Sequence, residues 1–240
     1  MKIVGLVGAS FCGSTIFGRT LSSLPDVYFP GELHWLLDPH DVPVCYMCGE
    51  DCPVFSREFA ATCTPENIYT RVASSIGALR GVLVSGDKLM QHYERYSRQP
   101  DVFVYLTRDP LTHVASLARE RSEKEAARVW KNFTLRTLEA LKRQGSAVLR
   151  VPLELFLLGP QEAVDWLSSQ TDIVPKGKVW LPYQTHNCGG NRHGAASHHI
   201  SPERPWKRSP ENVELVREIV APAVEALELC EFPTYARRQP

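Results

Sequence analysis

The sequence predicts an α/β fold in which a central parallel sheet is flanked by helices in three layers. Short apolar, β-branched runs alternate with longer helical patterns, which is the order of a βαβ repeat. The runs are continuously apolar rather than alternating, as expected for parallel strands covered on both faces. With 240 residues, 43% of them hydrophobic, the chain fits one domain with a sizeable core. We therefore expect a single domain over residues 1–240.

The expected elements follow this alternation in chain order. Helix starts are expected at Thr64-Pro65-Glu66 and Ser209-Pro210-Glu211, where a capping hydroxyl precedes proline and an acid. The second start opens an amphipathic helix to about Leu229. The apolar runs expected to be strands are residues 2–7 (KIVGLV), a second run ending at Pro30-Gly31, 81–85 (GVLVS), 101–107 (DVFVYLT) and 146–151 (SAVLRV), with helices expected after them, including 14–24 and 88–96.

Two irregular segments interrupt the alternation, at about residues 38–63 and 172–209. The first holds most of the cysteines together with several prolines, and the second is rich in His, Gly, Asn, Pro and Arg. The second is also too long for a simple connection in a compact domain. Both are candidate functional loops.

The charge and composition of the chain limit the classes of partner that it is expected to bind. Lys plus Arg equals Asp plus Glu, 27 of each, so no global field favours nucleic acid or an acidic membrane. The N-terminal residues lack the apolar core and cleavage site of a secretion signal, and no apolar run is long enough to cross a bilayer. We expect a cytoplasmic protein, whose seven cysteines are thiols or metal ligands rather than disulfides. Oligomeric state is left open.

The segment Gly8–Thr15, GASFCGST, follows the first strand and has the glycine frame of a phosphate-binding loop, GxxxxGK[ST]. Backbone N–H groups in such a turn, together with the start of the following helix, bind an anion. Ser14 stands where that motif has its lysine. The anion therefore carries less charge at the loop than ATP, or its cation comes from elsewhere in the chain.

Acidic residues that could hold magnesium beside this loop are Asp87 and Asp109, each at the end of an expected strand. Each lies next to a cation, Lys88 or Arg108. This arrangement favours anion binding over metal binding.

Four stretches, in order, resemble the sulfotransferases that use 3′-phosphoadenosine 5′-phosphosulfate (PAPS). The resemblance spans nearly the whole chain and implies a phosphate-loop fold similar to that of nucleotide triphosphatases, with PAPS as sulfuryl donor and a hydroxyl or amine of a small molecule as acceptor. The stretches are FCGST (11–15), similar to the 5′-phosphosulfate loop; LSSLPDVYFPGELHWL (21–36), similar to a passage containing "GE"; VFVYLTRDPLTHVASL (102–117), similar to the 3′-phosphate signature; and GGNRHGAASHHISPERPWKRSP (189–210), similar to the "GNPxR" and "L[ST]PE" landmarks.

The resemblance implies roles for individual residues. The loop binds the 5′-phosphate, and Lys88 supplies the cation that the loop lacks. Arg108 and Ser116 bind the ribose 3′-phosphate, and they share a face only if the chain turns after Pro110. This chain departs from the family at two loop positions, where Phe11 replaces a basic residue and Cys12 replaces serine. The full implied donor-binding set is Phe11, Cys12, Gly13, Ser14, Thr15, Arg108, Ser116, Gly190, Asn191 and Arg192.

Sulfuryl transfer needs a base that accepts the acceptor's proton. Glu32 is the first candidate, because it follows the second apolar run at the expected carboxyl edge of the sheet and matches the glutamate of the "GE" passage. Histidine is the alternative, and His34 is close enough to Glu32 to be oriented by it. The other candidate histidines are His113, His186, His193, His198 and His199. An aromatic acceptor wall could come from Trp35, Tyr93, Trp180 and Tyr183, which are equally expected in the core.

The cysteine-rich segment reads CYMCGEDC from Cys45 to Cys52, with Cys63 beyond it. The thiolates of Cys45, Cys48, Cys52 and Cys63 would suit tetrahedral zinc. Only one CxxC pair is present, however, and the resembled family often has a "CxCG…C" loop here. A structural zinc, a disulfide and free thiols therefore remain open alternatives.

Two other functions remain open at this stage. One is a phosphate-loop kinase or nucleotide triphosphatase that uses ATP and magnesium, which the missing lysine weighs against. The other is a catalytically silent nucleotide-binding module, which the departures at Phe11 and Cys12 keep open. Binding of adenosine 3′,5′-bisphosphate, compared with ATP and magnesium, separates all three.

Overall fold

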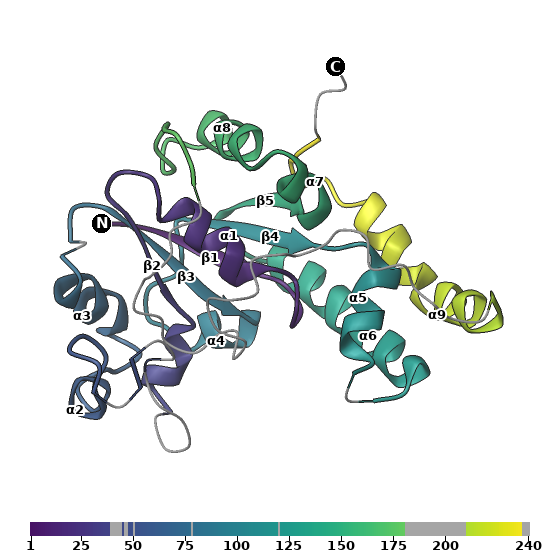
Figure 1. Ribbon diagram of the computed structural model, residues 1–240, viewed down its shortest axis with the longest axis horizontal. Helices are drawn as coiled ribbons and strands as arrows, with labels where there is room; N and C mark the ends of the chain where they lie inside the picture. Colours follow the sequence, from purple (N-terminus) through teal and green to yellow (C-terminus); the bar gives the residue numbers. More distant parts are fainter. Residues whose placement is uncertain are drawn as a thin grey trace.

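A computed structural model of the protein describes residues 1–38, 45, 48–49, 51–77, 79–119, 121–180 and 210–236. Its centre is a five-stranded parallel sheet with the strand order β2-β3-β1-β4-β5 (Figure 1). The strands are Lys2–Val7 (β1), Val27–Gly31 (β2), Val82–Lys88 (β3), Val102–Thr107 (β4) and Ala147–Pro152 (β5). The helices are Ser14–Leu21 (α1), the 3-10 helix Leu33–Leu36 (η1), Arg57–Ala60 (α2), Ile68–Ser75 (α3), Met90–Glu94 (α4), Pro110–Leu117 (α5), Glu123–Lys142 (α6), Leu153–Leu158 (α7), Pro160–Gln170 (α8) and Pro210–Glu228 (α9).

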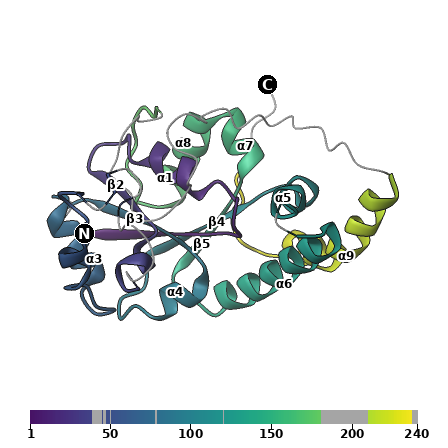
Figure 2. The same cartoon turned by 60° about the horizontal axis from the view of Figure 1, so that its bottom comes forward.

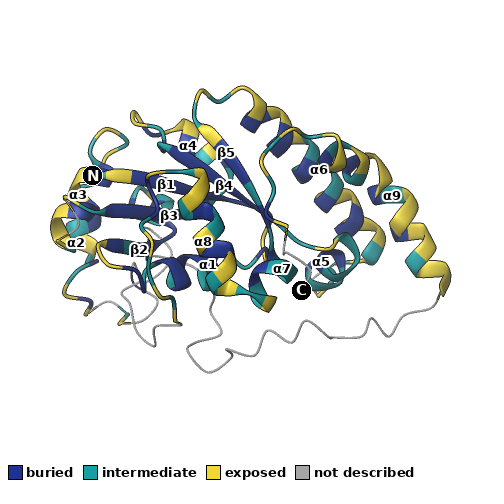
Figure 3. Ribbon diagram, turned by 90° about the horizontal axis from the view of Figure 1, so that it is seen from above, coloured by how far each residue is buried: buried dark blue, intermediate teal, exposed yellow. Residues whose placement is uncertain are grey.

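The sheet separates two hydrophobic cores. Val4 and Leu6 of β1 pack on one face with residues of α1, α7 and α8, whereas Ile3 and Val7 pack on the other with residues of α3 to α6 and α9. The helices accordingly lie on both sides of the sheet (Figure 2), and its strands are almost wholly buried between them (Figure 3). The expected three-layer α/β fold with a central parallel sheet is confirmed.

The carboxyl end of β3 is irregular. The β1–β3 register shifts between Gly5 and Val7, so that Val7 pairs with Lys88. Lys88 has a φ of 61°, in the left-handed region that non-glycine residues rarely adopt. Its carbonyl oxygen accepts the N–H of Gly8 at 3.0 Å. The last residue of β3 is therefore tied directly to the start of the glycine-rich loop.

Helix caps explain where several helices begin. Asp109 caps α5 by accepting the N–H of Thr112 at 2.8 Å, with Pro110 in the first turn. The final helix, α9, starts at Pro210 as expected. The expected start at Pro65 is three residues early: Thr64 Oγ1 accepts the N–H of Glu66 as expected of a cap, but the carbonyl of Pro65 accepts the N–H of Ser97, residues 65–67 form a turn, and α3 begins at Ile68.

Much of the two expected irregular segments lies outside the described residues. Of the segment 172–209, the structure describes residues 172–180, which contain no regular element. In the part of the chain that the structure describes, no helix is both long and apolar enough to cross a membrane.

Candidate functional site

The glycine-rich loop connects β1 to α1 and leaves the start of that helix open. Gly13, the residue before α1, has a φ of 86°, and a Cβ built there would lie 2.5 Å from a methyl carbon of Leu153. Only glycine fits this position. No side chain caps the first turn of α1, whose leading N–H groups have no partner within the helix. Such N–H groups at the start of a helix are suited to binding an anion.

The two family departures lie differently in this loop. Phe11 is 44% exposed and has a φ of 67°. Cys12 is fully buried, and its N–H donates to the carbonyl of Ala9 at 3.0 Å. Burial raises the pKa of the Cys12 thiol. The Cys12 side chain is thus part of the core beneath the loop, while the Phe11 ring faces outward.

Arg108 reaches the loop from the end of β4. Its Nη1 donates to Ser116 Oγ at 3.0 Å and to the carbonyl of Phe11 at 3.3 Å. The expected turn after Pro110 is wrong in place: α5 begins at Pro110, so the chain turns at residues 108–109, and this brings Arg108 and Ser116 together. Burial lowers the pKa of Arg108, although the charge of Glu154 opposes the shift; Glu154 Oε1 lies 3.9 Å from Arg108 Nε. The side chain of Asp109 is engaged in capping α5 instead of pairing with this arginine.

His113 supports the glycine-rich loop through a hydrogen bond to its backbone. Its Nε2 lies 2.6 Å from the carbonyl oxygen of Ser10, and its Nδ1 lies 3.1 Å from Trp130 Nε1. The carbonyl can only accept and the indole can only donate, so His113 is neutral with its proton on Nε2. Burial lowers its pKa to about 4, with the Ser10 hydrogen bond opposing the shift. Both ring nitrogens are engaged, so this histidine acts as a structural support.

Glu32 and Lys88 meet at the carboxyl edge of the sheet. Glu32 follows β2, precedes η1 and is 7% exposed. Lys88 Nζ lies 2.5 Å from Glu32 Oε1, in an ion-pair contact without the alignment of a hydrogen bond. Because Lys88 also binds Gly8 through its carbonyl, a carboxylate and an ammonium lie beside the anion-binding loop.

Asp87, the residue before Lys88, is the centre of a buried polar network. It is fully buried, and its Oδ2 accepts hydrogen bonds from Ser85 Oγ at 2.5 Å and Tyr96 OH at 2.9 Å. Its Oδ1 accepts the backbone N–H of His34 at 2.7 Å and contacts the ring Nδ1 of His34 at 3.0 Å. Burial alone would raise the pKa of Asp87, but the hydrogen bonds from His34 and Ser85 outweigh it and hold that pKa below its usual value.

His92 completes this network from α4. Its Nδ1 lies 3.1 Å from the carbonyl oxygen of Asp87, and its ring stacks on His34 with centroids 3.8 Å apart. Burial lowers the pKa of His92, as does the charge of a protonated His34. Asp87 thus orients both imidazoles through contacts with their Nδ1 atoms.

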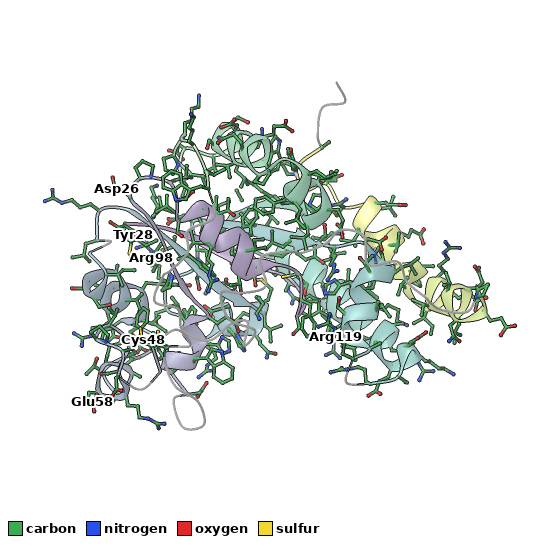
Figure 4. The ribbon with its side chains drawn as sticks, viewed as in Figure 1. Asp26, Tyr28, Cys48, Glu58, Arg98 and Arg119 are labelled. Carbon is green, nitrogen blue, oxygen red and sulfur yellow. The ribbon has the colours of Figure 1, made fainter. Side chains whose placement is uncertain are left out.

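Sequence reasoning missed three contributors to this edge. His92 and Tyr96 lie in a stretch that the sequence marks only as a helical pattern, and both contact Asp87, which the sequence does place at a strand end. Arg119, beyond the end of α5, is exposed, and its charge contributes to lowering the pKa of Arg108. It lies on the α5–α6 side of the molecule (Figure 4).

Several predicted residues lie away from this edge or outside the described part. Tyr93 is core: it is fully buried and its OH donates to the carbonyl oxygens of Leu6 and Ser85. Trp180 is 60% exposed, and Trp35 stacks against His34 with centroids 4.9 Å apart. The residues outside the described part are Tyr183, His186, Gly190, Asn191, Arg192, His193, His198 and His199.

Comparisons with known proteins agree with this architecture. No protein-family model and no curated protein matches the sequence. Among solved structures, the chain is similar to the crystal structure of a sulfotransferase from Alicyclobacillus acidocaldarius, with a TM-score of 0.53 and 17% sequence identity over 95% of this chain and 94% of that one. This chain has the sulfotransferase fold. At this identity the likeness is one of fold, and the chemistry has to be argued from the side chains.

In open parallel sheets, ligands bind beyond the carboxyl ends of the strands. The glycine-rich loop follows β1, Glu32 follows β2, Lys88 ends β3 and Arg108 follows β4. This sulfotransferase fold therefore presents a loop for an anion, two cations and a carboxylate at one edge.

Proposed function

We propose that this protein is a PAPS-dependent sulfotransferase that acts on a hydroxyl or amine of a small molecule. The observation that carries the proposal is the contact between Glu32 and Lys88 at 2.5 Å, beside a phosphate loop that has no lysine of its own. A carboxylate and an ammonium at this position match the two needs of sulfuryl transfer, a proton acceptor and a cation near the transferring group.

The loop and Arg108 would hold the donor. The open first turn of α1, from Gly13 to Thr15, offers N–H and hydroxyl donors to the 5′-phosphate. Arg108 lies 3.0 Å from Ser116 Oγ, so a guanidinium fork and a hydroxyl can bind the ribose 3′-phosphate together. The charges at the edge therefore fit a nucleotide with phosphates at both ends of its ribose.

In the proposed reaction, the acceptor oxygen or nitrogen forms a bond to sulfur while the bond from sulfur to the 5′-phosphate oxygen breaks. Glu32 takes the proton that the acceptor loses, and Lys88 balances the negative charge that develops around the transferring group. The product nucleotide is adenosine 3′,5′-bisphosphate.

His34 is the alternative base. Its Nδ1 contact with Asp87 resembles the carboxylate–imidazole pairs that orient a catalytic histidine. We assign the base to Glu32 because it contacts Lys88 directly, whereas His34 is stacked on His92. Substituting Glu32 and His34 one at a time distinguishes the two candidates. Loss of the base should lower turnover and leave the affinity for the donor unchanged.

The magnesium-dependent alternative requires an acidic side chain with oxygens available to the metal. Asp87 accepts hydrogen bonds from Ser85, Tyr96 and the backbone of His34, and Asp109 caps α5. Neither carboxylate has the surroundings of a magnesium ligand. These contacts support the sulfotransferase proposal over an ATP-dependent kinase.

Titration calorimetry with adenosine 3′,5′-bisphosphate, and separately with ATP and magnesium, tests the proposal. We expect binding of the bisphosphate and weak or absent binding of ATP. Tight binding of ATP alone would refute the proposal in favour of a kinase. Failure to bind either nucleotide would refute it in favour of a silent module.

A further inference from the structure

The segment after η1 gathers three cysteine thiols. The sulfur atoms of Cys45, Cys48 and Cys52 all lie within 4.8 Å of one another. Cys45 and Cys52 are buried, whereas Cys48 is exposed. All three are thiols rather than disulfide partners. Three thiols so close, from a segment of eight residues, form a cluster with the composition of a soft-metal site.

The local backbone brings the first two thiols together. Gly49, directly after Cys48, has a φ of 74°, and its N–H donates to the carbonyl of Cys45 at 2.9 Å. The same two residues form an isolated antiparallel bridge. The chain therefore reverses within Cys-x-x-Cys-Gly, a spacing that suits two ligands of one tetrahedral ion.

The third thiol is held differently. The N–H of Phe55 donates to Cys52 Sγ at 3.3 Å. Cys45 and Cys52 also pack in one hydrophobic cluster with Leu33 and Leu36 of η1. Thiolates in such a setting need a cation to offset the loss of hydration.

The predicted fourth ligand, Cys63, has a separate partner. Its Sγ donates to the carbonyl of Phe59 at 3.6 Å, and Cys63 is not a member of the cluster. Burial raises the pKa of its thiol to about 11. Among the described residues, the set of four cysteines expected from the sequence is therefore a set of three, with Cys63 outside it.

We propose that Cys45, Cys48 and Cys52 bind one Zn²⁺ ion as three thiolate ligands, with water in the fourth position on the exposed side of Cys48. Tetrahedral zinc with Zn–S bonds of about 2.3 Å places its sulfurs about 3.8 Å apart, so the cluster needs only a small contraction. Cys48 lies at the end of the molecule that holds α2 and α3, away from α9 (Figure 4).

The metal would anchor the residues that follow the proposed base. Glu32 precedes η1 and His34 lies within it, and Leu33 and Leu36 of η1 belong to the same buried cluster as Cys45 and Cys52. A bound ion would therefore stabilise the buried cluster that η1 shares with Cys45 and Cys52. This role does not depend on which reaction the site performs.

The test uses the full chain purified without chelators, with zinc measured by mass spectrometry. We expect about one zinc per chain. Loss of a residue that only orients a ligand lowers metal affinity by about 10- to 100-fold, so Cys48→Ser, which removes a ligand, should lower it by about 100-fold or more. Cys48 is exposed, so this variant should fold, which circular dichroism checks. Cys63→Ser is the matched control and should bind zinc like the wild type.

Cobalt substitution tests the ligand set directly. Co²⁺ in the site should give thiolate charge-transfer absorption and tetrahedral d–d bands, and imidazole should shift the d–d bands by replacing the water. A zinc content near zero, or unchanged affinity in folded Cys48→Ser, would overturn the site. Loss of zinc in Cys63→Ser would overturn the three-thiolate assignment, and bands that do not respond to imidazole would overturn the open fourth position.

Discussion

Exchange of Glu32 for glutamine tests the proposed base with the least change in shape. The substitution removes the charge that Lys88 Nζ meets at 2.5 Å and the ability to accept a proton. A general base contributes about 100- to 10,000-fold in rate, which corresponds to about 3 to 5 kcal/mol of activation free energy. Glu32→Gln should therefore lower kcat by that factor. Affinity for adenosine 3′,5′-bisphosphate should change by only about threefold, because the donor is held mainly by the loop and Arg108.

The substitution should also have a moderate effect on stability. Breaking a fully buried ion pair costs about 3–5 kcal/mol, but the Lys88 side chain is 21% exposed and its ammonium can be hydrated. A loss of about 1–3 kcal/mol in the free energy of unfolding follows, measurable by urea denaturation.

The assay is release of adenosine 3′,5′-bisphosphate from PAPS with a panel of phenol, alcohol and amine acceptors, followed by chromatography, with calorimetry for binding. The matched control is Glu139→Gln, which removes a carboxylate from an exposed ion pair with Arg143 at 2.9 Å and should leave turnover unchanged. Turnover by Glu32→Gln within about threefold of the wild type would refute the assignment of the base. In that case His34→Gln becomes the decisive variant.

Three further predictions concern the loop and its supports. Arg108→Met should weaken binding of adenosine 3′,5′-bisphosphate by about 10- to 100-fold, as expected for the loss of a charged hydrogen bond. Binding of adenosine 5′-phosphate, which has no 3′-phosphate, should be unchanged. Equal losses of affinity for both ligands would argue against a 3′-phosphate site. Gly13→Ala should destabilise the fold by about 2 kcal/mol or more, since it places a Cβ 2.5 Å from Leu153 at positive φ. Gly145→Ala, with open space around its Cβ, is the control and should change stability by about 0.5 kcal/mol at most. Similar losses of stability in the two variants would contradict this prediction. For His113, burial lowers the pKa to about 4, below about 6.5 in the unfolded chain, so the unfolded state binds the proton more tightly between these values. The free energy of unfolding should therefore fall by up to about 3 kcal/mol as the pH drops through this window. His113→Gln should remove this part of the pH dependence, and parallel pH curves for wild type and variant would disprove it.

Most of the sheet could be predicted because its strands are continuously apolar. The expected strand 101–107 differs from β4, Val102–Thr107, by one residue, and the run KIVGLV coincides with β1. The start of α3 could not be predicted in the same way, because a contact from another part of the chain intervenes. Thr64 Oγ1 accepts the N–H of Glu66 as a cap does, but the carbonyl of Pro65 accepts the N–H of Ser97, and the helix begins only at Ile68.

The site was predictable where sequence order determines position, and unpredictable where side chains from different elements meet. Arg108 and Ser116 lie in one strand-to-helix unit, so their contact at 3.0 Å follows from the turn at residues 108–109 before α5. The network around Asp87 joins η1, β3 and α4, and its geometry depends on how the end of β3 bends. No periodicity in the sequence indicates that His34 and His92 stack on each other.

Two residues beside the proposed donor site have a left-handed backbone conformation, which is unfavourable for a residue with a side chain. Phe11 and Lys88 have φ values of 67° and 61°, a conformation that costs a non-glycine residue about 1–2 kcal/mol. A screen of this protein for thermal stability alone should therefore favour glycine at position 88, and the chain so selected would have a relaxed β3 end and would lack the ammonium that contacts Glu32. Stability and activity thus compete for a single residue, and we expect variants improved for one to lose the other.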